Sequence, residues 1–335
     1  MKKLSLLFVT LLIFSACADR EGITEPGDAF YKVAEIETVG PVNDLELRNG
    51  HIYAATGELG MKVISVNDPE NPMILGEYDP QNGYSKGITV LEKGARTFAF
   101  VAAGSYLGVY IVDVTNPAEP GWWGAIGGGV TDVVESIEDV AVVDTMLYVA
   151  DRSGGLASFE IEDIEEVPDP HLDHRLRTRG YARGLAIRDS IIYVAVGEAG
   201  LSTVRHDPEK TSGVLEELGT ADTPDFARDI VVSEDLIAFV ADEDYGIYVF
   251  DVSDPWNPVE LGSRETPGEA RKLFLHGDRL LVADAWEGLT VLDVSRPDRP
   301  EIAGQYIIDG ASSVTADDTY IYLGTEHNGL LILEW

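Results

Sequence analysis

A short pattern recurs seven times along the chain, at intervals of 41 to 48 residues. In each copy a glycine opens an apolar run, and these glycines are Gly60, Gly108, Gly155, Gly200, Gly246, Gly288 and Gly329. A small residue ends the run before it, and these residues are Ala55, Ala102, Ala150, Ala195, Ala241, Ala283 and Gly324. Two positions earlier stands a large residue each time: Tyr53, Phe100, Tyr148, Tyr193, Phe239, Leu281 and Tyr322. Three matched positions in seven copies indicate a structural repeat.

One copy, residues 229–268, shows the content of the repeat unit. Its apolar and β-branched runs cover residues 229–232, 236–241, 247–252 and 259–265, and Ser, Asp, Gly and Pro separate them. Such runs are too short for helices and are typical of strands. Four strands in a period of this length are typical of a propeller blade, whose two faces are buried by its neighbours. We therefore predict an all-β protein, a seven-bladed β-propeller of four-stranded antiparallel blades, over residues 30–335.

The last copy is incomplete, because the chain ends after the third strand of that unit. The missing strand has a candidate at the other end of the propeller sequence. Residues 30–40 match residues 260–268, with Glu37-Thr38-x-Gly40 over Glu265-Thr266-x-Gly268. We therefore expect the N-terminal strand to complete the last blade and to remove the exposed edges of the ring.

The strings Val-Ala-Asp…Gly-Leu and Val-Leu-Asp-Val-Ser-x-Pro-x-x-Pro, the latter at residues 291–300, resemble those of the LVIVD-repeat proteins. The resemblance covers roughly residues 30–335. It implies an exported bacterial or archaeal β-propeller, and it supplies no established activity and no catalytic residues. The third and fourth copies depart from the pattern at residues 162–180 and 207–213, where the Pro-x-x-Pro turn is lost.

The first residues are typical of an export signal. Two lysines precede an apolar run over residues 4–14, which is too short to span a membrane as a stable helix. Cys17, the only cysteine, follows small residues and resembles a lipobox cysteine. We predict a signal peptide over residues 1–16, a lipidated Cys17 with a flexible tether over residues 17–29, and a cell-envelope lipoprotein on the outer membrane or cell surface. The alternative is ordinary signal cleavage near Ala16, which would leave a free thiol.

The chain is strongly acidic, with 59 acidic and 24 basic residues and a formal net charge of −35. A surface of this sign argues against nucleic acid and anionic membrane surfaces as partners. It fits either a high-salt habitat, where charges are screened, or a very soluble exported protein. A lone cysteine excludes an internal disulfide, so stability must come from packing. We expect a monomer without a cofactor.

Basic residues are concentrated at one repeat position despite this composition. The first strand of a propeller blade faces the central channel, and at its start stand Asn43, Lys86, Glu138, Arg183, Arg228, Arg271 and Ser312. Tyr84, Tyr181 and Phe226 shortly precede three of them, and Trp286 lies on a loop at the same end. Arginine matches planar anions, so this end is a candidate site for a carboxylate, phosphate or acidic sugar.

A structural interpretation of the same arginines stays open beside this one. Asp151, Asp242 and Asp284 end second strands at the same end of the propeller. Asp151 could pair with Arg183, and Asp242 with Arg271, which would brace the ring. Arg228 faces a blade with Val196 at that position, so bracing explains it least.

The sequence offers little for catalysis or for metals. It lacks a nucleophile elbow, a Cys–His pair and a phosphate loop. His171 and His174 stand three residues apart without a third ligand, so we expect no metal site. The favoured hypothesis is a non-catalytic, membrane-anchored propeller that binds a protein or an anionic small molecule or carbohydrate. The alternative is a propeller hydrolase or lyase acting on an anionic carbohydrate or lactone.

Overall fold

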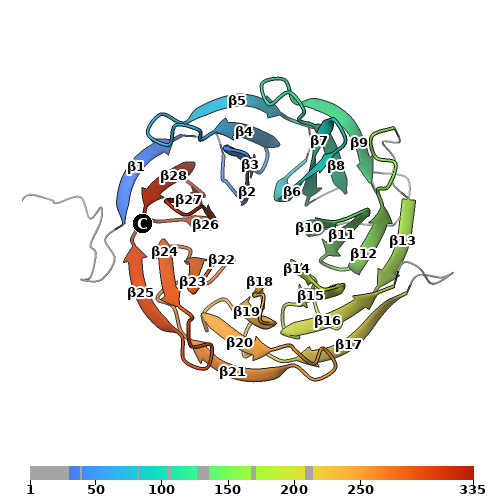
Figure 1. The fold of residues 1–335 in the computed structure, drawn as a ribbon, viewed down its shortest axis with the longest axis vertical. Coiled ribbons are helices and arrows are strands. Elements are labelled where there is room, and N and C mark those ends of the chain that lie inside the picture. Colours follow the sequence, from blue (N-terminus) through green and yellow to red (C-terminus); the bar gives the residue numbers. More distant parts are fainter. Residues whose placement is uncertain are drawn as a thin grey trace, which may run out of the picture.

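The computed structural model describes residues 30–37, 40–81, 83–104, 108–126, 136–166, 171–207 and 214–335. These residues form seven four-stranded sheets arranged in a closed ring around a central axis (Figure 1). The described part of the chain is all-β, and it contains no helix long and apolar enough to cross a membrane. The expected signal peptide, Cys17 and the tether lie outside the described residues.

Each sheet is one blade, and the blades follow the chain order. The strands of blades one to three are β2 (Asp44–Arg48), β3 (His51–Ala55), β4 (Met61–Ser65) and β5 (Met73–Tyr78); β6 (Ser85–Lys93), β7 (Arg96–Ala103), β8 (Val109–Asp113) and β9 (Gly121–Ile126); β10 (Ile137–Val143), β11 (Met146–Asp151), β12 (Gly155–Glu160) and β13 (His171–Leu176). The strands of blades four and five are β14 (Gly184–Arg188), β15 (Ile191–Ala195), β16 (Leu201–His206) and β17 (Leu215–Ala221); β18 (Asp229–Val232), β19 (Ile237–Ala241), β20 (Ile247–Asp251) and β21 (Val259–Arg264).

Blade six contains β22 (Lys272–His276), β23 (Arg279–Ala283), β24 (Leu289–Asp293) and β25 (Glu301–Tyr306). Blade seven contains β26 (Ala311–Ala316), β27 (Tyr320–Thr325), β28 (Leu330–Glu334) and the N-terminal strand β1 (Tyr31–Ile36). All strand pairs are antiparallel, and the first strand of each blade lies nearest the axis in Figure 1. The predicted fold class is therefore confirmed.

The repeated glycine has a conformational reason. All seven of these glycines adopt a positive φ, between 67° and 89°. A Cβ at Gly246 would lie 2.4 Å from the backbone oxygen of Arg264, on the next strand of the same blade. A side chain would therefore be strained by the backbone conformation and would also collide with the outer strand.

The hydrophobic core is divided among the seams between blades. Each hydrophobic cluster joins two neighbouring sheets: Tyr53 and Val63 of blade one, for example, pack with Ile88 and Val101 of blade two. Further clusters of this kind fill the other six seams of the ring. The large residue of the repeat lies in these clusters, which explains its recurrence.

The two ends of the propeller sequence meet in blade seven. Strand β1 pairs with β28 in the register Tyr31 opposite Glu334 and Ile36 opposite Leu330. The residue before β1, Phe30, is 5% exposed and packs in the seam between blades six and seven. The N-terminal strand thus closes the ring, as the match to residues 260–268 predicts.

This closure can be tested at two adjacent residues. Phe30→Ala removes a buried aromatic ring from the closing seam, and we expect a loss of about 3–5 kcal/mol in the free energy of unfolding. Tyr31, which is 63% exposed, provides the matched control, because Tyr31→Ala removes a ring that packs little. Urea unfolding of both variants measures the difference. Equal losses would contradict the closing role of Phe30.

Candidate functional site at the channel mouth

The start of every first strand contributes to one cavity at the end of the channel. Its volume is about 320 Å³, and its lining residues are Asn43, Tyr84, Lys86, Glu138, Arg183, Arg228, Arg271, Lys272, Ser312 and Glu326. All seven residues of the expected channel position belong to this set. We call this cavity the mouth. The repeat alignment therefore placed its polar residues in the correct part of the fold.

The cations of the mouth are paired, but with glutamates. Glu138 lies between two of them, 2.6 Å from Lys86 Nζ and 3.2 Å from Arg183 NH1. Its side chain is 9% exposed, so both contacts are largely shielded from water. The expected pair of Asp151 with Arg183 is wrong. Asp151 instead lies 3.4 Å from Arg175 and accepts hydrogen bonds from the backbone N–H groups of Ser153 and Gly154.

The other two arginines share a second glutamate. Arg228 contacts Glu269 at 2.8 Å, and Arg271 contacts the same carboxylate at 3.4 Å. Arg228 also pairs with Glu243 at 2.6 Å, and Arg271 with Glu326. The expectation that bracing explains Arg228 least is therefore wrong, since this residue bridges two carboxylates.

The aspartates at the ends of the second strands hold loops. Asp242 accepts a hydrogen bond from the backbone N–H of Asp225, so the expected pair of Asp242 with Arg271 is also wrong. Asp284 accepts hydrogen bonds from the hydroxyls of Thr266 and Thr290 and from the N–H of Gly268. Backbone amides and threonine hydroxyls of the nearby loops and strands thus occupy Asp242 and Asp284 in place of the mouth arginines.

The four predicted aromatic residues separate into two groups. Tyr84 is the aromatic residue among the described lining of the mouth. Tyr181 and Phe226 lie beside each other with ring centroids 6.4 Å apart, and the guanidinium of Arg183 lies 4.9 Å from the Phe226 ring. Trp286 is 49% exposed and does not line the cavity. Phe226 thus positions Arg183 by a cation–π contact rather than facing the cavity itself.

Beneath the mouth lies a charged layer that the sequence analysis did not recognise. The next residue of each first strand is Asp44, Gly87, Asp139, Gly184, Asp229, Lys272 or Ser313, in blade order. The ammonium of Lys272 lies 3.6 Å from Asp44, 3.8 Å from Asp139 and 3.6 Å from Asp229. In the sequence, the layer is visible as an alternation of Asp and Gly at this position of the first five blades.

The three aspartates of this layer also join neighbouring blades. Each accepts a hydrogen bond from a backbone N–H of the next blade in the ring, and these donors are Ile88, Leu185 and Leu273. Lys272 lines both the mouth and a second cavity of about 260 Å³ further along the channel. The charged layer therefore separates two spaces within the channel.

Comparison with known proteins agrees with this architecture. The family model of the LVIVD repeat matches residues 82–126, 226–266 and 267–307. The chain is a seven-bladed β-propeller that contains LVIVD repeats. Comparison with curated protein sequences finds no match.

Solved structures share the fold of this LVIVD-repeat propeller at low sequence identity. The WD40 β-propeller domain of Doa1 is similar with a TM-score of 0.67 and 10% identity, over 91% of this chain and 97% of that one. The computationally designed protein Ika8 is similar with a TM-score of 0.60 and 9% identity, over 91% of this chain and 100% of that one. At such identities the similarity concerns the fold alone.

In the charged layer of this LVIVD-repeat propeller, burial and neighbouring charges shift the pKa values of the side chains. Burial raises the pKa of Asp44 to about 7, although the nearby Lys272 charge lowers it in part. Burial likewise raises the pKa of Asp229. Burial opposes the charge of Lys272, but the three surrounding aspartates hold its pKa well above the ordinary value. Lys272 is therefore charged at neutral pH. The aspartates around it repel one another, and this repulsion adds to the effect of burial on their pKa values.

A pH-dependent stability follows from Asp44. Its pKa is higher in the folded chain than the ordinary 3.8, so between about pH 4 and 7 the folded state binds more protons than the unfolded state. Stability must then fall as the pH rises through this window, by up to about 1.4 kcal/mol per pH unit for one group. We expect Asp44→Asn to raise the melting temperature at pH 8 and to raise it less at pH 5, because the stability cost of the carboxyl grows across this range. The amide oxygen can still accept the hydrogen bond from Ile88.

The matched control is Asp318→Asn, since the side chain of Asp318 is 98% exposed. Melting curves from pH 5 to 8 compare both variants with the unmodified protein. An Asp44→Asn variant that is less stable than the unmodified protein at pH 8 would contradict the raised pKa of Asp44.

Proposed function

We propose that this LVIVD-repeat propeller is a non-catalytic binding protein of the cell envelope, anchored by a lipid at Cys17. Its proposed ligand is a small hydroxylated carboxylate, such as an acidic sugar, bound in the mouth. The observation that carries the proposal is the convergence of Lys86, Arg183, Arg228 and Arg271 on one cavity of a protein with a net charge of −35.

The glutamates of the mouth define what ligand would fit. They neutralise part of the positive charge, so a simple anion would gain little from charge alone. They also offer hydrogen-bond acceptors beside the guanidinium donors. A ligand with both a carboxylate and hydroxyl groups would use both sets, since the hydroxyls can donate to glutamate and the carboxylate can accept from arginine.

Unused donors support a ligand at this place. The Nε atoms of Arg183 and Arg271 are buried and have no hydrogen-bond partner among the described residues. An unsatisfied buried donor costs free energy, and a bound acceptor would recover part of this cost. The glutamate contacts would hold these guanidinium groups in position before a ligand arrives.

Ion pairing in the channel favours binding over catalysis. Glu138 and Glu269 at the mouth are each shared by two cations. A carboxylate acting as general acid or base needs a proton that it can exchange with substrate. Carboxylates engaged by lysine and arginine are better suited to holding the site's shape.

Variants of two mouth arginines distinguish a role in ligand binding from a role in stabilising the ring. Arg183→Met leaves Glu138 paired with Lys86 and keeps an aliphatic stem on Phe226, so the melting temperature should change little. Ligand affinity should fall about tenfold or more, because a charge-assisted hydrogen bond is worth roughly 1.5–3 kcal/mol. Arg228→Met is the matched control for stability, since it leaves Glu243 without this cation and should lower the melting temperature by several degrees.

The measurement is a melting-shift screen followed by calorimetry. Glucuronate, sialic acid, phosphate and sulfated sugars are the probes, and glucose controls for the hydroxyl groups alone. A screen in which no acid stabilises the unmodified protein would refute the mouth as a binding site. Unchanged affinity in Arg183→Met would refute the role of that residue.

The proposed anchor has a test of its own. Cys17→Ser should move the protein from the membrane fraction to the soluble fraction in a bacterial host, because acyl chains would no longer hold it in the bilayer. Cell fractionation with immunoblotting measures this change. An unmodified protein that is soluble without detergent would contradict the lipoprotein assignment.

A further inference from the structure

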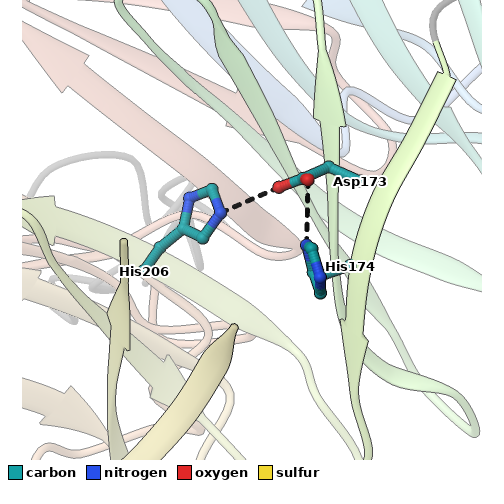
Figure 2. Close-up of side chains that lie close together, drawn as sticks. All are labelled: Asp173, His174 and His206. Atoms are coloured by element: carbon teal, nitrogen blue, oxygen red, sulfur yellow. Dashed lines mark hydrogen bonds and ion pairs between the residues drawn. The ribbon is translucent and has the colours of Figure 1, made fainter. Parts of the chain in front are cut away.

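Three side chains with metal-binding atoms meet at the seam between blades three and four. Asp173 and His174 lie on β13, the outer strand of blade three, and His206 ends β16 of blade four. Asp173 lies between the two imidazoles (Figure 2): its Oδ2 is 2.8 Å from His206 Nε2, and its Oδ1 is 2.9 Å from His174 Nδ1. His171, the histidine three residues before His174, lies at the start of β13. The third member missed by the sequence analysis is His206.

The repeat shows what stands at these positions elsewhere in the ring. The outer strand of every blade contains an irregularity at which one residue is skipped in the pairing. Asp173 is the skipped residue of blade three, and its counterparts are Leu75, Trp123, Leu218, Leu261, Ala303 and Val33. His174 follows it, and its counterparts are Gly76, Gly124, Gly219, Gly262, Gly304 and Ala34. Six blades thus use an apolar residue followed by a small one.

His206 also replaces an apolar residue. The counterparts at the end of the third strand are Val66, Val114, Ile161, Val252, Val294 and Trp335. At other seams these residues share a hydrophobic cluster with the skipped residue, as Leu261 does with Val294 and Val33 with Val66. Packing therefore does not require Asp, His and His at this seam. Buried polar groups in place of well-packed apolar ones generally add little stability, so another role is indicated.

We propose that Asp173, His174 and His206 bind a divalent transition-metal ion, with Zn²⁺ as the best match. Two imidazole nitrogens and one carboxylate are a common zinc ligand set, which leaves the fourth position to water. The donor atoms lie within 4.8 Å of one another. Tetrahedral zinc with bonds of about 2.0–2.2 Å places its donor atoms roughly 3.4 Å apart. Donors farther apart than this would move inward, and the Asp173 oxygens, which lie 2.8 and 2.9 Å from the two ring nitrogens, would move slightly outward.

One donor faces the site without a hydrogen bond. His174 Nδ1 is buried, and its short contact with Asp173 lacks the angle of a hydrogen bond, so this nitrogen has no hydrogen-bond partner among the described residues. A bound metal would accept its lone pair. The His174 side chain as a whole is 28% exposed, whereas that of His206 is 1% exposed, so an ion can enter from the His174 side.

Neighbouring groups hold the donors in position. The Tyr148 hydroxyl lies 2.8 Å from His206 Nδ1, which directs Nε2 toward Asp173. When a metal takes Nε2, the ring proton moves to Nδ1 and the Tyr148 oxygen accepts it, as the outer hydrogen bond of a metal-ligating histidine requires. The Ser158 hydroxyl donates to Asp173 Oδ2 at 3.2 Å. Ser158 stands where five of the other six blades have an apolar residue such as Val249, and where blade four has Thr203.

The test uses ZnCl₂ and the purified protein in a buffer without chelator. We expect one zinc ion per chain by calorimetry and a higher melting temperature with zinc. His174→Ala should weaken binding at least tenfold, and Tyr148→Phe about tenfold, since it removes only the outer hydrogen bond. The triple variant Asp173→Leu, His174→Gly, His206→Val restores the apolar pattern of the other blades. It should melt at the same or a higher temperature without zinc and should lose the response to zinc.

His276→Ala is the matched control, because His276 ends β22 of blade six and contacts the exposed carboxylate of Asp318, on the turn between β26 and β27. Its zinc response should equal that of the unmodified protein. Absence of zinc binding in the unmodified protein overturns the proposal. A response that survives in His174→Ala, or binding of several ions that the triple variant retains, also overturns it, because zinc would then bind surface carboxylates. His174→Ala keeps the test valid even if the triple variant fails to fold.

Discussion

Burial of both faces of every blade is the constraint on which this structure depends. A four-stranded sheet with two apolar faces cannot bury either face alone, and each hydrophobic cluster of the ring is shared by two neighbours. No blade is therefore stable by itself, and the ring must close. Closure through β1 satisfies the free edge of β28, and Phe30 fills the last seam. The same constraint explains why the repeat retains the large residue and the small residue, which pack in the seams, whereas the glycine is required by its backbone conformation within the blade.

Seven-fold convergence creates an electrostatic problem at the axis. One side chain from every blade arrives in a narrow channel, where a charge has little water to solvate it. The protein answers with paired charges in two layers. Lys272 offsets part of the charge of three aspartates in the lower layer, and shared glutamates pair with the arginines of the mouth. Because such pairs contribute little net stability, their value lies in holding side chains in defined positions. A binding cavity needs that kind of preorganisation.

The sequence predicted the ring and its closure because the determining residues recur with the repeat. It also predicted which residues reach the mouth, since strand position alone decides that. It could not predict the pairings. Glu243, Glu269 and Glu326 lie outside the strands, and their reach depends on loop conformations that no repeat pattern records. The charged layer was visible in the alternation of Asp44, Gly87 and Asp139. The sequence does not show that these side chains face one another across the channel, so the layer could not be predicted from the alternation.

In a repeat protein, each blade can be compared with the other blades of the same chain, so a departure from the shared pattern is informative. Six seams show what packing alone selects, so the polar residues at the seam between blades three and four cannot be attributed to packing. Sequence reasoning noticed that these two blades lose their Pro-x-x-Pro turns but did not join His174 to His206, which lie on different blades and 32 residues apart. The ring brings them together because Asp173 and His174 on the outer strand of blade three lie beside His206 of blade four (Figure 2). An apolar pair at this seam would have closed the ring equally well. The chain instead places one carboxylate between two imidazoles, and a bound cation would convert this polar exception into a link between two blades.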